Sequence, residues 1–186
     1  MLNRFRKLLE SNKAFAASVD ESIKTRSARL RDLVDRIEMH VKQKSSAQKF
    51  SHVHEFLFIS ARVYKMCTRS EDDRIRIRAS TTSMVQGIPW ERLADDQLAI
   101  SLWSSATVGS VPASLEKIDL VGRQFSGNKS FSNVVWSLAR FSDSHGVSVK
   151  DQARSLVLKM DSKRSLSLSN DEIVSVLRAL ATIHSQ

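Results

Sequence analysis

The sequence predicts an all-α fold of stacked helical hairpins, which is a short α-solenoid. A Trp-containing segment at residues 97–106 recurs at residues 131–141, with Trp136 placed 33 residues after Trp103, and a more divergent copy follows at residues 173–183. The chain also holds only 5 glycines and 2 prolines in 186 residues, too few for the many turns of an all-β protein. Such recurrence is typical of helical pairs that stack because one pair cannot bury its own apolar face.

Residues 1–19 form a basic, amphipathic N-terminal segment. Its apolar side chains include Leu2, Phe5 and Leu8, and basic residues such as Arg4 and Lys7 lie among them. On a helix this pattern resembles a mitochondrial presequence, although Glu10 departs from the usual acid-poor composition. The segment predicts either an uncleaved mitochondrial signal or simply a first helix.

Residues 20–88 predict a set of N-terminal helices at about 20–44, 47–67 and 68–86. The spacing of Thr68 and Glu71 predicts a capping box at the start of the third helix. Residues 74–78 alternate Arg and Ile, a pattern that also suits a strand with three arginines on one face. We favour a helix there because the sequence contains no partner strand.

Residues 89–186 predict the helical-repeat region, with helices at about 89–108, 112–126, 130–144, 148–161 and 169–184. Glycine followed by proline punctuates the first two, as at Gly87 and Pro89. Ser169 and Glu172 predict a capping box for the last helix. The helices are expected to alternate between a type that carries the Trp/Ala segment and a type without it.

The repeated positions predict a structural core in which alanines allow close helix approach and tryptophans fill the space beside them. Its expected members are Trp103, Ala106, Trp136, Leu138, Ala139, Leu180 and Ala181. Arg178 replaces the tryptophan in the third copy, which predicts a terminal cap. Stacking of the two tryptophans on nucleic-acid bases is the alternative.

The segment Asn133–Phe141 resembles the helix found in heptatricopeptide and octotricopeptide repeats, and in the repeats of FAST-kinase-like and RAP-domain proteins. The resemblance extends, more weakly, over residues 89–186. It implies an organellar helical-repeat protein with a role in RNA processing, RNA stability or ribosome function. It brings no catalytic residue, and the chain shows no RAP domain.

The net charge of +9 favours a polyanionic partner such as nucleic acid or an anionic membrane surface. The excess is greatest in residues 1–50, which hold 12 basic and 6 acidic residues. Basic residues at the repeat edges and in the arginine strip are the candidate RNA contacts, and a solvated helix face is the alternative for each of them. The candidates are Arg74, Arg76, Arg78, Lys129, Arg140, Lys159, Lys163 and Arg164.

The sequence favours neither an enzyme nor a metal protein. Cys67 has no second cysteine with which to form a disulfide or a multi-cysteine metal site. His52 and His54, two residues apart, point in different directions on a helix. The P-loop-like run at residues 122–130 has Asn128 inserted before the lysine, which moves Lys129 out of register. We therefore expect no cofactor and no metal. No apolar run of the sequence is long enough for a membrane span.

These observations predict a non-catalytic, RNA-associated subunit of a ribonucleoprotein in the mitochondrial matrix. A mitochondrial ribosome component or assembly factor fits this description best, with rRNA or another mitochondrial RNA and other protein subunits as partners. The alternative is a protein–protein scaffold, or accessory subunit, of a mitochondrial RNA-editing or respiratory complex without direct RNA contact.

Overall fold

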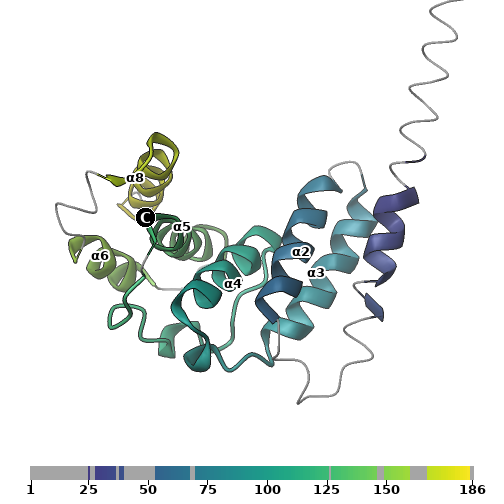
Figure 1. The fold of residues 1–186 in the computed structure, drawn as a ribbon, viewed down its shortest axis with the longest axis horizontal. Helices are drawn as coiled ribbons and strands as arrows, with labels where there is room; N and C mark the ends of the chain where they lie inside the picture. The colour runs from purple at the N-terminus through teal and green to yellow at the C-terminus, as the bar shows by residue number, and fades with distance from the viewer. Residues whose placement is uncertain are drawn as a thin grey trace, which may run out of the picture.

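The computed structural model describes residues 25, 28–36, 38–39, 53–67, 70–125, 127–145, 149–159 and 167–184. The predicted N-terminal segment, residues 1–19, lies outside these ranges. The described residues form helices and no strand, so the all-α class is confirmed (Figure 1). The bounds are α2 (Val53–Met66), α3 (Glu71–Val85), α4 (Asp95–Val108), α5 (Asn128–His145), α6 (Lys150–Leu158) and α8 (Asn170–His184). Short 3₁₀ helices lie at Trp90–Arg92 and Leu115–Lys117, and residues 28–36 are helical.

Four helices follow one another as neighbours along the molecule. Helix α2 packs on α4, α4 on α5, and α5 on α8, while α3 packs against α2 and α4, and α6 against α5 (Figure 1). The helical residues 28–36 lie beside α3 at one end of this row. The three helices that carry the repeated segment, α4, α5 and α8, are therefore neighbours in this order.

The predicted helix at residues 112–126 is wrong, and with it the regular alternation of two helix types. Apart from the 3₁₀ helix at Leu115–Lys117, the described part of this segment is irregular. Leu115, Ile118, Leu120 and Phe125 are all buried. At about 100° per residue, a helix would place Leu120 roughly 140° away from Leu115, far from the other two. A helix could not bury all four side chains at once, whereas an irregular segment does.

Arg123 fastens this irregular segment to the start of α4. Its guanidinium donates hydrogen bonds to the carbonyl oxygens of Leu93 (2.5 Å) and Glu91 (2.7 Å) and to Oδ1 of Asp95 (3.0 Å). The other carboxylate oxygen of Asp95 accepts a hydrogen bond from the backbone N–H of Gln124 (3.2 Å). The bond from Gln124 satisfies one backbone group of the irregular segment, and the bonds from Arg123 attach the segment to the residues at the start of α4.

Two hydrophobic cores hold the helices together. The larger runs from Val53 on α2 to Ile183 on α8, across the predicted boundary between residues 88 and 89. The smaller joins Val34, Ala61, Ile77 and neighbours at the N-terminal end. Trp90 is the fully buried tryptophan, 1% exposed, and its Nε1–H donates to the carbonyl oxygen of Val85 (3.3 Å).

The predicted repeat core requires correction. Ala106, Leu138 and Ala139 are buried, but Trp103, Trp136 and Leu180 are only half-buried at the edges of the two cores. Ala181, expected in the core, is exposed. The buried side of α8 carries Val176, Ala179 and Ile183, and a residue two positions from Ala179 points about 200° away from it.

The helix starts show where local sequence signals succeed. Ser169 and Glu172 form the predicted capping box of α8, with Ser169 N–H donating to Oε2 of Glu172 (2.8 Å) and Glu172 N–H to Oγ of Ser169 (3.4 Å). At α3 the cap is Ser70, whose Oγ accepts from Asp73 N–H (3.3 Å), and not the predicted Thr68. The preference for a helix over a strand at residues 74–78 is confirmed.

Candidate nucleic-acid interface

A pocket of about 480 Å³ lies where side chains of α2, α3, α4, α5 and α8 meet. We call it the basic pocket. Four cationic side chains line it, together with Trp136 and a single carboxylate, Asp143. The cations are Lys65, Arg74, Arg140 and Arg178. Because cations outnumber carboxylates in a concave site, the local potential is positive and attracts anions.

Helices α5 and α8 supply the wall that contains the indole of Trp136. Small side chains, Ala139 of α5 and Ala179 of α8, line the pocket beside it and let the two helices approach closely. Trp136 also packs against the larger core, which holds the side chain while leaving it half-buried. The pocket therefore combines an aromatic surface with positive charge.

Two of the four cations have no carboxylate partner among the described residues. Arg178 is exposed on α8, and its guanidinium makes no ion pair in this part of the chain. Lys65 is also exposed, and its Nζ lies 4.9 Å from the ring centroid of Trp103 in a cation–π contact. Both charges remain able to bind an anion.

Arg140 is weakly paired. Its Nη1 lies 3.9 Å from Oδ2 of Asp143, one turn along α5, and both side chains are 52% exposed. An exposed pair at that distance contributes little to stability. A phosphate could therefore displace Asp143 from Arg140 at small cost.

Tyr64 holds Arg74, the remaining cation of the basic pocket, in place. Its hydroxyl oxygen accepts hydrogen bonds from Nη2 of Arg74 (2.9 Å) and Nη2 of Arg78 (2.7 Å), and the Arg74 guanidinium lies 4.6 Å from the ring centroid. Arg74 also pairs with Glu71 (3.1 Å). The hydrogen bond to Tyr64 raises the pKa of Arg74. Arg78 is tied to the end of α4 through the carbonyl oxygen of Val108 (3.1 Å) and does not line the pocket.

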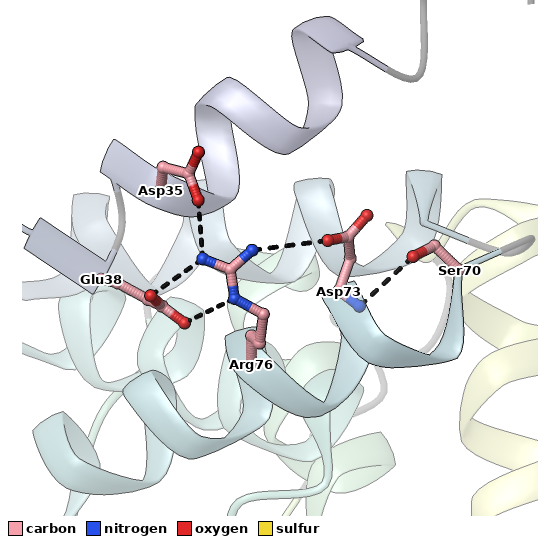
Figure 2. Close-up of polar contacts among 5 residues, drawn as sticks. All are labelled: Asp35, Glu38, Ser70, Asp73 and Arg76. Carbon is pink, nitrogen blue, oxygen red and sulfur yellow. Dashed lines mark hydrogen bonds and ion pairs between the residues drawn. The ribbon is translucent and has the colours of Figure 1, made fainter. Parts of the chain in front are cut away.

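Arg76 is engaged by carboxylates within the protein. Figure 2 shows its guanidinium between carboxylates of two elements: Nη2 donates to Oδ1 of Asp35 (2.6 Å), and Nε donates to Oε1 of Glu38 (2.9 Å). Nη1 lies 3.7 Å from Oδ1 of Asp73 on its own helix. The hydrogen bonds to Glu38, and then to Asp35, raise the pKa of Arg76. The alternating arginines therefore serve opposite faces of α3: Arg74 and Arg78 meet Tyr64, and Arg76 meets the N-terminal helical residues.

The other predicted contacts do not join the basic pocket. Lys129 is exposed near the start of α5, and Nζ of Lys159 donates to the carbonyl oxygen of Val121 (3.0 Å). Lys163 and Arg164 lie outside the described residues. Among the eight candidates, the structure brings Arg74 and Arg140 together at the pocket. Sequence reasoning missed Lys65 and Arg178 as candidates, although Arg178 was visible as the residue that replaces tryptophan in the third copy.

The features that the sequence offered for chemistry lie in the following settings. No group of three His, Cys, Asp or Glu side chains among them could hold a metal ion. The P-loop-like run follows an irregular segment instead of the strand that a P-loop requires. Cys67 is buried, and burial, followed by the nearby charge of Asp73, raises the pKa of its thiol. The pocket is suited to binding an anion.

Comparisons of this chain with protein-family models, with curated proteins and with solved structures find no match. The resemblance to organellar helical repeats therefore stays a prediction. In the part of the chain that the structure describes, no helix is long and apolar enough to cross a membrane.

Proposed function

We propose that this protein is a non-catalytic, RNA-associated subunit of a mitochondrial ribonucleoprotein, as a component or assembly factor of the mitochondrial ribosome. The observation that carries the proposal is the basic pocket, where Lys65, Arg74, Arg140 and Arg178 converge around Trp136. RNA binding depends largely on phosphate contacts made by such cations on a rigid scaffold. The net charge of +9 supports attraction of a polyanion over a longer range.

The mitochondrial setting rests on the sequence. The basic, amphipathic residues 1–19 and the repeat resemblance of residues 89–186 both favour it. Co-sedimentation of the tagged native protein with mitochondrial ribosomal particles, followed by crosslinking to rRNA, tests this part of the proposal. Sedimentation apart from every RNA-containing particle would contradict it.

Direct RNA contact is tested with the purified full chain and a fluorescent single-stranded RNA over a series of salt concentrations. Phosphate contacts release counterions, so the logarithm of the binding constant should fall linearly as the logarithm of the salt concentration rises. The double variant Arg140→Gln/Arg178→Gln should bind more weakly and show a shallower slope. Arg92→Gln is the matched control, because Arg92 is exposed but lies outside the pocket. Absent or salt-insensitive binding would contradict RNA contact.

A specific observation favours a protein–protein scaffold as the second candidate function. The outer side of α8 exposes Ile173 (36%), Val174 (43%) and Leu177 (60%), and Phe58 and Ile59 are exposed at an apolar pocket on α2. Such surfaces are common at protein interfaces. If Leu177→Asp detaches the protein from its native particle while RNA binding by the purified chain is unchanged, the particle is held through protein contacts.

A further inference from the structure

We infer that the basic pocket receives one unstacked nucleotide of single-stranded RNA, with its base against the indole of Trp136 and its phosphate between Arg140 and Arg178. This inference rests on the proposed function and specifies how the RNA is held. Contact with a base distinguishes such a site from a basic surface that binds only the phosphate backbone.

The size of the pocket favours a single nucleotide. Its volume of about 480 Å³ lies within the roughly 300–1,000 Å³ typical of sites for small molecules. Bases inside an A-form duplex are stacked on one another and cannot enter such a site, whereas bases of single-stranded RNA can turn outward. The pocket therefore selects against duplex RNA.

The state of Trp136 favours an aromatic ligand. Trp136 is half-buried and lines the pocket, and within the described residues no other ring or cation stacks on it. Trp103, at the equivalent repeat position, differs because Phe58 lies 5.9 Å and Lys65 4.9 Å from its ring. The neighbours of Trp136 in the pocket, Ala139 and Ala179, are too small to cover an indole. The ring face of Trp136 is thus available for stacking, whereas that of Trp103 is already in contact with Phe58 and Lys65.

The charges stand at positions suited to the phosphate of the same nucleotide. Arg140 is four residues after Trp136 on α5, so both side chains project from one face of that helix. Arg178 reaches the same pocket from α8 without a carboxylate partner among the described residues. A phosphate bound there would neutralise Arg178 and replace the 3.9 Å pair between Arg140 and Asp143. Base and phosphate groups are therefore recognised side by side.

The first experiment needs no variant. The full chain is titrated with a short single-stranded RNA, with the same backbone lacking its bases, and with the corresponding duplex. Stacking on an aromatic side chain predicts that the abasic strand and the duplex each bind about tenfold more weakly or worse. Equal affinity for all three would overturn the nucleotide pocket while leaving the proposed RNA function intact. Failure to bind any RNA, or equal binding of polyglutamate, would overturn both.

A second experiment assigns the stacking to Trp136. With the fluorescent base 2-aminopurine in the single strand, stacking on Trp136 should quench its fluorescence when the RNA binds. Trp136→Leu should abolish this quenching and weaken binding about tenfold. Trp136→Phe should retain part of the quenching and part of the affinity. Trp103→Leu is the control for quenching alone, because Trp103 is half-buried at the equivalent position and does not line the pocket. Affinity is not compared in this variant, since the Trp103 ring contacts Lys65 of the pocket. Thermal unfolding of each variant verifies its fold. Full quenching in folded Trp136→Leu, or loss of quenching in folded Trp103→Leu, would overturn the assignment.

Discussion

Arg76 and Glu38 form a bidentate ion pair although they lie 38 residues apart in the sequence. Nε of Arg76 donates to Oε1 of Glu38, and Nη2 donates to Oε2, each at 2.9 Å (Figure 2). This planar pairing fixes the N-terminal helical residues against α3, where Val34 is buried with Ile77. Arg76, a candidate RNA contact in the sequence, thus joins two elements of the fold.

Arg76→Met should lower the free energy of unfolding by about 1–2 kcal/mol, because charge-assisted hydrogen bonds are lost at a site that solvent partly screens. Arg76→Lys should not restore stability, since an ammonium cannot make the two-point contact. Urea unfolding measures both variants, with Arg92→Met as the control for loss of an exposed arginine. The RNA affinity of Arg76→Met should change no more than that of Arg92→Met. A selective loss of RNA binding in Arg76→Met would show that Arg76 contacts RNA.

Arg123→Met should lower the free energy of unfolding by about 2 kcal/mol, since two backbone carbonyls and Asp95 lose a charged hydrogen-bond donor. The side chain of Arg123 is only 17% exposed, so water replaces it poorly. Chemical denaturation measures the effect against the same Arg92→Met control. A loss equal to that of the control would show that the segment is held by its buried apolar residues alone.

Gly109→Ala should destabilise the protein by about 1 kcal/mol, because Gly109 ends α4 with a φ of 81°, a left-handed conformation costly for other residues. Gly87→Ala is the matched control. Gly87 has no positive φ, and an added Cβ would meet nothing closer than 3.7 Å. Thermal or urea unfolding compares the two. Equal stability of both variants would contradict the strain at Gly109.

Cys67 should react slowly with thiol reagents near pH 8 in the folded protein and rapidly after unfolding. Its burial raises the pKa of the thiol, so less of the reactive thiolate is present at a given pH than in the unfolded chain. By the same linkage, this residue's contribution to stability is complete below the unfolded pKa and declines as the pH rises above it. Rates with a chromogenic disulfide, with and without denaturant, measure the reactivity. Equal rates in both states would show that the thiol is open to solvent.

Arg178→Gln alone should reduce the slope of log binding constant against log salt by about 0.7, the value expected for one phosphate contact on a single strand. The change should be smaller for Lys129→Gln, because Lys129 lies away from the basic pocket. Fluorescence anisotropy over a salt series gives both slopes. Equal reductions would place the RNA on a diffuse basic surface.

The helical class, and the features that depend on neighbouring residues, follow from the amino-acid sequence alone. The capping box of Ser169 and Glu172 starts α8 where predicted because its bonds join residues three apart. The helix at residues 74–78 likewise formed despite the alternating pattern. The repeated positions also located the buried Ala106 and Ala139, since close helix packing requires small side chains at fixed spacing.

Which side chains share a site depends on how the helices pack. One pocket brings together Lys65, Arg74, Arg140 and Arg178, because their helices, α2, α3, α5 and α8, are brought together by packing. No local sequence pattern predicts this packing. Arg74 and Arg76 are two residues apart, yet one faces Tyr64 at the pocket and the other faces Glu38. The same long-range packing kept residues 112–125 out of a helix, since their four large apolar side chains reach the core only along an irregular path.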